Sequence, residues 1–133
     1  MKIRPIKESD VEYLRRWHAG SGFEYPFPDI SSPEFVACYV VADDDDKPIQ
    51  AYLAKETIEM YALFDPQWQT PRRRIDAMVE AHEAVRLRLK ELGYKDVNCW
   101  IPPQIEKSFG RRLSRIFGWV RSQWASYSRK IEV

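Results

Sequence analysis

The sequence predicts an α/β fold of the α+β kind, with one mixed sheet that has an N-terminal antiparallel meander, a parallel central pair of strands and helices on both faces. Short apolar runs rich in β-forming residues alternate with segments of helical period, and turn residues separate the two kinds. A long helical segment lies between two of the apolar runs, and such a crossover makes the flanking strands parallel neighbours. The length of 133 residues favours a single domain over residues 1–133.

The first half of the chain predicts a strand, a helix and then the rest of the meander. Residues 3–6 are a short strand candidate, and Ser9 follows as the N-cap of a helix, with Glu12 closing a capping box. A proline- and aromatic-rich segment over 23–33 predicts an ordered loop. Apolar runs then predict three antiparallel strands at 35–42, 49–54 and 57–64.

The second half predicts a long helix, a strand and a second helix. Thr70 is the N-cap and Pro71 the first residue of the long helix, which Gly93 ends. Its apolar stripe consists of Ile75, Met78, His82, Val85, Leu89 and Leu92. On that stripe, His82 is expected to be a packed histidine rather than a ligand or a base. Further elements are a strand at 96–101, a helix at 105–116 and two short strands in the tail 119–133.

The charge balance restricts the class of partner. The chain has 21 Lys and Arg against 20 Asp and Glu, and this balance excludes a polycation that binds nucleic acid by bulk charge alone. The charges are nevertheless uneven, because residues 29–59 hold eight acids and two bases whereas residues 104–130 hold seven bases and one acid. We expect no membrane partner and a cytoplasmic location, since no apolar run approaches a membrane span and no secretory signal opens the chain.

Two residue groups that could suggest other chemistry have simpler interpretations. Cys38 and Cys99 match no zinc spacing and have no partnered histidine nearby in sequence, so we expect free thiols that do not act as nucleophiles. The four consecutive aspartates at 43–46 cannot all coordinate one ion, so a solvated hairpin turn is the favoured interpretation. The sequence therefore predicts no metal site.

Two stretches and the order of elements carry a resemblance to a known family. Residues Ile3-Arg4-Pro5-Ile6 with Ser9-Asp10-Val11, and Leu113-Ser114-Arg115-Ile116-Phe117-Gly118-Trp119 near the other end, resemble the GCN5-related N-acetyltransferase family, including its short phage-type members. The resemblance implies acetyl-CoA as co-substrate, lying between the two parallel strands with its pyrophosphate at the start of the following helix. It also implies direct attack by an amine-bearing small molecule or peptide.

The resemblance places coenzyme A at the start of the long helix, where Gln69 fits the first position of the family's pyrophosphate loop. Arg72 and Arg74 stand where the family has glycines, and Pro71 removes one amide donor. Two interpretations stay open: the arginines form a fork to a phosphate, or they belong to a solvated helix start that Asp76 partly neutralises. The candidate cofactor-binding residues are Gln69, Thr70, Arg72, Arg73 and Arg74.

The resemblance also implies catalytic positions. A carboxylate on the third long strand of the meander often serves as base, which makes Glu56 and Glu59 the candidates, although both also fit ordinary exposed strand residues. The family's tyrosine position, four residues before Gly118, holds Ser114. A serine hydroxyl is a poor acid, so the acid role is absent or is taken by Tyr61 or Tyr127.

The basic stretch 104–130 suits the phosphates of coenzyme A, and the acidic meander suits a cationic amine. The rival hypothesis is a catalytically inactive member of the same fold that binds a protein or nucleic-acid partner through the 23–33 loop or the basic tail, with nucleic acid the less favoured partner. The sequence leaves open whether the protein is a monomer or a homodimer.

Overall fold

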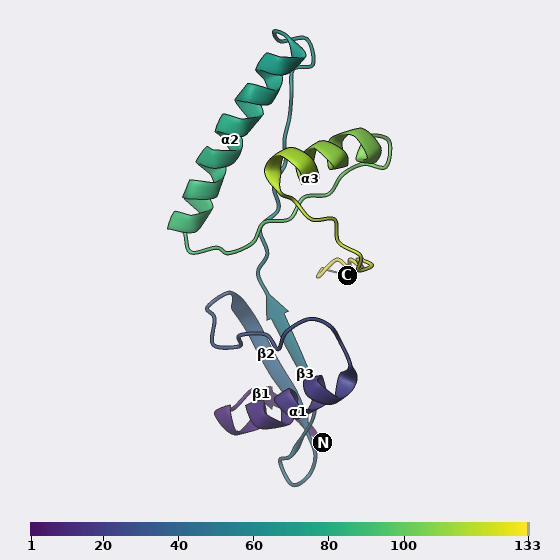
Figure 1. Cartoon of the computed structure of the whole chain (residues 1–133). Helices are drawn as coiled ribbons and strands as arrows, with labels where there is room; N and C mark the ends of the chain where they lie inside the picture. Colours follow the sequence, from purple (N-terminus) through teal and green to yellow (C-terminus); the bar gives the residue numbers. More distant parts are fainter. Residues whose placement is uncertain (133) are drawn as a thin grey trace. The chain divides into compact units, whose positions relative to one another are not determined.

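The computed structural model describes residues 1–132, and the chain divides into two compact units. The N-terminal unit comprises Met1–Thr57 and the C-terminal unit begins at Ile58. Figure 1 shows that the sheet belongs to the N-terminal unit and the longest helix to the C-terminal unit. Among the described residues, no helix combines the length and the apolar character that crossing a bilayer requires.

The N-terminal unit is a three-stranded antiparallel sheet with one helix. The strands β1 (Lys2–Pro5), β2 (Phe35–Ala42) and β3 (Pro48–Lys55) lie in the order β1-β2-β3. The helix α1 (Val11–Ser21) lies along this sheet (Figure 1). The predicted first strand, first helix and first hairpin of the meander are therefore confirmed, with ends that differ by one or two residues.

The core of this unit lies between α1 and one face of the sheet. Arg4 is opposite Val40 in the register, so the two residues share a face, and Arg4 pairs with Asp10 just before α1. Leu14 of α1 and Val40 are buried. Tyr39 is one residue from Val40 and therefore faces the opposite side, where it is 47% exposed. One face of the sheet is thus covered and the other is open.

The start of α1 differs from the prediction. Ser9 does not cap the helix; a 3-10 turn over Glu8–Asp10 precedes it, and the Asp10 carboxylate accepts the backbone N–H of Lys7 at 2.7 Å. The same carboxylate accepts two hydrogen bonds from the Arg4 guanidinium, at 2.7 and 3.0 Å. The buried Asp10 is held by an interaction between distant elements, and this interaction outweighs the local capping signal of Ser9.

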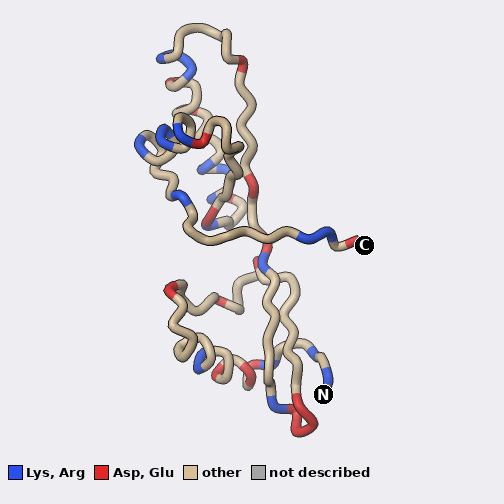
Figure 2. Tube along the Cα trace, turned by 90° about the vertical axis from the view of Figure 1, so that its right-hand side faces the viewer, with Lys and Arg blue, Asp and Glu red and all other residues tan. Residues whose placement is uncertain are grey.

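The acidic turn between β2 and β3 is tied to the start of the chain. The Asp46 carboxylate contacts Lys7, Arg4 and Lys2, which hold its pKa well below the ordinary value. Asp44 pairs with the N-terminal amine at 2.6 Å. Figure 2 shows this turn beside the basic N-terminal segment. Within residues 1–132, no group of three potential ligands could hold a metal ion.

The regular elements of the C-terminal unit are helices. It contains α2 (Pro71–Glu91), a π-helical turn over Glu106–Gly110, and α3 (Arg111–Phe117). The Thr70 hydroxyl accepts the N–H of Arg73 at 3.2 Å, which confirms the predicted N-cap with Pro71 at the first position. Gly93 (φ 88°) and Gly118 (φ 72°) adopt left-handed conformations just past the two helices, as their predicted role as stops requires.

The predicted strands at 57–64 and 96–101 are wrong as regular strands. They meet in a single parallel bridge between Glu59 and Asn98, with Asn98 bonded to the backbones of Ile58 and Met60 at 2.8 Å each. The parallel direction is confirmed at this bridge. The pairing does not extend further, in keeping with the marginal stability in water of an isolated pair of strands that has no further neighbour.

The tail and the helix packing complete the C-terminal unit. The two predicted tail strands are wrong, because the described part of the tail, residues 119–132, contains no regular strand. The His82 ring stacks on Phe117 with centroids 3.9 Å apart, and Trp119 meets it edge-on at 6.2 Å. The prediction of a packed histidine is confirmed. Leu113 of α3 is buried in this unit.

Candidate functional site

The parallel bridge places a carboxylate between two hydrogen-bond donors. In extended backbone, residues two apart point to the same side, so Glu59 shares its side with Tyr61, and Trp100 shares the side of Asn98 across the bridge. The Tyr61 hydroxyl donates to Glu59 Oε2 at 2.9 Å, and the Trp100 indole Nε1 donates to Oε1 at 3.0 Å. Each carboxylate oxygen keeps a lone pair for a further donor.

The electrostatics of this group favour a protonated tyrosine. The hydrogen bond to Glu59, together with the charge of that carboxylate, raises the pKa of Tyr61, because loss of the phenolic proton would place two negative charges side by side. Tyr61 is therefore a neutral phenol at neutral pH. Tyr61 is 78% exposed, Trp100 is 63% exposed and Glu59 is itself exposed, so a substrate can reach the carboxylate from solvent.

A cavity of about 830 Å³ lies in the C-terminal unit, within the range of small-molecule sites. We call it the α3 cavity. It is enclosed by the segment 97–101, by α3 and by the tail residues 119–126. Trp100 lines it, so the residue that holds Glu59 also forms a wall of the cavity. Ser114, the predicted counterpart of the family's tyrosine, is another lining residue.

The α3 cavity carries positive charge. Arg121 is paired with Glu106, Nε to Oε1 at 2.5 Å. Arg111 and Arg115 also line the cavity, and no carboxylate among residues 1–132 pairs with either of them. Because they are four residues apart on α3, they lie on the same helix face and their charges repel each other. The cavity therefore contains two positive charges without a counterion within the described chain.

Cys99 also lines the α3 cavity and is a free thiol. Burial raises its pKa, because desolvation disfavours the thiolate. The thiolate is the nucleophilic form of cysteine. The arrangement therefore does not favour an acyl-enzyme on Cys99.

The predicted cofactor-binding residues surround the start of α2. Arg74 Nη1 donates to the carbonyl oxygens of Trp68 at 3.0 Å and Gln69 at 2.9 Å, so this guanidinium is used within the loop. Arg73 lies 4.0 Å from Asp76, and in the described chain Arg72 has no ion-pair partner. None of the predicted cofactor-binding residues lines the α3 cavity.

The structure distinguishes the two predicted bases. The backbone N–H of Glu56 donates to the carbonyl of Glu34 at 2.8 Å next to β3, and Glu56 belongs to the N-terminal unit. Glu59 belongs to the C-terminal unit and is the one held by Tyr61 and Trp100. Tyr127, the other acid candidate, is 95% exposed. The structure thus brings Glu59 and Tyr61 together. Trp100 donates a hydrogen bond to Glu59 and lines the same cavity as Ser114.

Sequence reasoning did not identify Trp100. It assigned Arg111 and Arg115 to the basic stretch 104–130 but did not single them out as a pair on one face of a helix. The signal for Trp100 was its spacing of two from Asn98 on the strand predicted to lie beside Glu59. The signal for Arg111 and Arg115 was their spacing of four on a predicted helix, which places both on one face.

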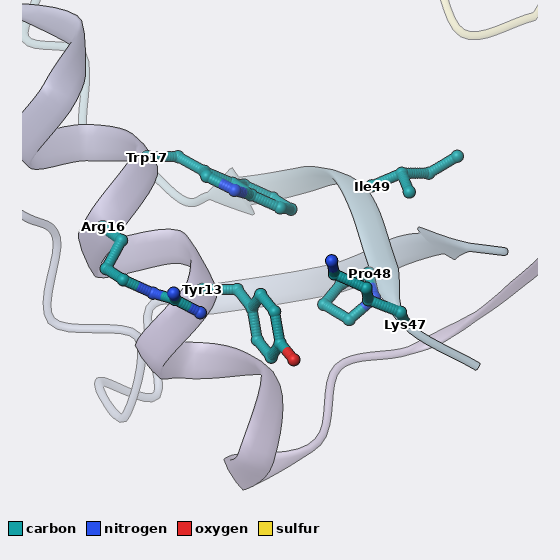
Figure 3. Close-up of a pocket in the computed structure, with 6 residues that line it drawn as sticks. All are labelled: Tyr13, Arg16, Trp17, Lys47, Pro48 and Ile49. Carbon is teal, nitrogen blue, oxygen red and sulfur yellow. The ribbon is translucent and has the colours of Figure 1, made fainter. Parts of the chain in front are cut away.

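The N-terminal unit has a groove of its own, of about 420 Å³ (Figure 3). The Tyr13 and Trp17 side chains extend from α1 toward Pro48 after the acidic turn. The Arg16 guanidinium lies 4.8 Å from the Tyr13 ring centroid, and the Lys47 ammonium 5.9 Å from it. No carboxylate lines this groove and no predicted site residue is among its walls. The α3 cavity beside Glu59 is therefore the candidate functional site.

Comparisons of this chain with protein-family models, with curated proteins and with solved structures give no match.

Proposed function

We propose that the protein is an acetyl-CoA-dependent N-acyltransferase that acetylates an amine by direct attack, as its resemblance to GCN5-related N-acetyltransferases implies. One observation carries the proposal. A carboxylate, Glu59, stands at a parallel bridge and is oriented by the Tyr61 hydroxyl and the Trp100 indole, next to a cavity that Trp100 lines. A carboxylate held in place with free lone pairs and access to solvent has the properties of a general base.

The proton transfers follow from the Glu59–Tyr61 hydrogen bond. Acetyl-CoA supplies a thioester carbon to which the amine nitrogen bonds, while the C–S bond breaks and its electrons leave with sulfur. Glu59 takes the proton that the amine loses, directly or through water. Tyr61 gives its phenolic proton to the leaving sulfur, and Glu59 then returns the proton it accepted to Tyr61 along their 2.9 Å contact. Both side chains end in their initial protonation states.

The residues at the start of α2 fit an anion mainly through side-chain charge. Pro71 has no N–H, and the N–H of Arg73 is bonded to Thr70 Oγ1. The pyrophosphate of acetyl-CoA would therefore be held by the Arg72 and Arg73 guanidinium groups and by the N–H of Arg72. Arg74 would act as a positioning residue, because its guanidinium fixes the loop carbonyls of Trp68 and Gln69.

The proposal is tested with the wild-type protein in two measurements. Isothermal titration calorimetry with acetyl-CoA should give saturable heat, and thiol release in the presence of an amine panel should exceed the release without protein. Absence of heat at millimolar acetyl-CoA would remove the transferase proposal. Heat without any acyl transfer across the panel would contradict the catalytic part of it.

The second candidate function is the catalytically inactive binding module. The α3 cavity favours it, because Arg111 and Arg115 lack counterions in the described chain and Trp100 forms an aromatic wall. Binding of an anionic ligand in this cavity, with no thiol release under any condition, is the result that would select this second candidate.

A further inference from the structure

The unpaired charges of the α3 cavity indicate what it binds. Arg111 and Arg115 are four residues apart on a helix of seven residues, so their guanidinium groups share one face. Like charges at this spacing destabilise a helix. Both side chains line the cavity, whereas Arg112, on the same helix, does not. An anion in the cavity would relieve the repulsion and could accept hydrogen bonds from both guanidinium groups.

The walls of the cavity suit a ligand with an apolar body. Trp100 and Trp124 line it and are each 63% exposed, and Trp119 is a third tryptophan in the lining. Indole rings present flat faces on which an aromatic or planar ligand can stack. Ser114 lies between the two arginines in sequence and adds a hydroxyl that can donate or accept a hydrogen bond.

The Trp100 end of the cavity adjoins the proposed base. Glu59 does not itself line the cavity, but its carboxylate accepts the hydrogen bond of the Trp100 Nε1 atom at 3.0 Å and so lies next to the Trp100 wall, while α3 supplies the cationic end. In the N-terminal unit, by contrast, the carboxylates of Asp44 and Asp46 are already paired with the terminal amine and with basic side chains of this chain. The charges of the α3 cavity therefore favour an acceptor with an anionic group, whereas the acidic meander suggested a purely cationic amine.

We infer that the α3 cavity binds an acceptor that carries both an amine and an anionic group, with a carboxylate or phosphate on Arg111 and Arg115 and the amine toward Glu59. The inference rests on the proposed acyl transfer for the fate of the amine. Binding of the anion itself does not depend on that reaction.

Calorimetry without acetyl-CoA tests the inference with probe pairs that differ only in the anion. The carboxylate pair is L-phenylalanine and L-phenylalaninamide, and the phosphate pair is phosphoethanolamine and ethanolamine. At least one anionic probe should bind with an affinity at least about tenfold higher than the analogue that lacks the anion. A factor of this size is expected because the analogue loses a charge-assisted hydrogen bond to the arginines. Whichever pair shows this preference identifies the anion as carboxylate or phosphate.

Three variants on α3 locate the binding. Arg111→Gln and Arg115→Gln should each lower the affinity for the preferred anionic probe by about tenfold. Arg115→Lys, which keeps the charge, should retain most of that affinity. Arg112→Gln is the matched control and should leave the affinity unchanged. Equal binding of both members of each pair, no binding of any probe, or an equal loss in Arg112→Gln would overturn the inference.

The inference and the proposed function fail in distinguishable ways. If anions bind in a way that depends on Arg111 and Arg115 but no amine is acetylated, the inferred ligand class stands and the proposed transferase activity is excluded. Equal rates of acetylation of amines with and without an anion retain the transferase and remove the ligand class.

Discussion

Leu113→Ala should loosen α3 and with it the candidate site. Leu113 is the buried residue of this helix, at 3% exposure, and it lines the α3 cavity next to Ser114. The change deletes three carbon atoms, which is worth about 2.4 kcal/mol of transfer free energy at about 0.8 kcal/mol each. The space left behind adds to this, so the free energy of unfolding of the C-terminal unit should fall by about 3 kcal/mol.

The matched control is Ile116→Ala on the same helix, because Ile116 is 45% exposed and its removal leaves no enclosed space. We expect a loss of about 1 kcal/mol for this control. Urea unfolding followed by tryptophan fluorescence gives the global change, and amide hydrogen exchange over Arg111–Phe117 gives the local one. Equal destabilisation by the two substitutions would refute the packing that we assign to Leu113.

Two further predictions concern charge. The Arg4 hydrogen bonds lower the pKa of Asp10 below its ordinary value of 3.8, so the stability that this carboxylate gives to the N-terminal unit is present above pH 3.8 and is lost as the pH falls through the lower folded-state value. Protection of the β1 amides against exchange, relative to the intrinsic rate at each pH, should therefore fall at acid pH in the wild type. Asp10→Asn should remove the part of that pH dependence that Asp10 contributes, leave the part that comes from Asp46, and lower the protection at neutral pH. The double variant Arg72→Gln, Arg73→Gln should weaken acetyl-CoA binding about tenfold or more in calorimetry; an equal loss in Arg88→Gln, at the other end of α2, would contradict the proposed anion contact.

The helix ends could be predicted from the sequence because their signals are local. Thr70 with Pro71 begins α2, and Gly93 and Gly118 take left-handed conformations just past the two helices. Such signals depend on a residue and its nearest neighbours, and distant parts of the chain seldom change them.

The elements that were predicted wrongly depend on distant partners. Ser9 has the right residue type for an N-cap, but Asp10 sits at the turn because Arg4 reaches it from β1. The candidate strands around Glu59 and Asn98 have suitable composition, yet only one bridge forms between them. A strand requires a neighbour over its length, and local composition does not specify how far that neighbour stays in register.

In the candidate site, too, the features set by position in the chain could be predicted, and those set by distant contacts could not. Glu59 could be proposed from the expected strand pairing and from family resemblance, because both refer to its position in the chain. Its orientation by Trp100 could not, since the two residues are 41 positions apart and meet only through the bridge. The exclusion of Arg112 from the cavity likewise depends on how α3 packs, with Leu113 as its buried residue.

The most direct measurement is kcat/KM for thiol release from acetyl-CoA, compared between Glu59→Gln and Glu56→Gln. The glutamine at 59 keeps an oxygen that can accept the hydrogen bond from Trp100, so the change removes the base with little change in shape. We expect a fall of about 10²–10⁴-fold for Glu59→Gln and none for Glu56→Gln. Equal activity of the two variants, or a loss only in Glu56→Gln, would contradict the assignment of Glu59 as the base.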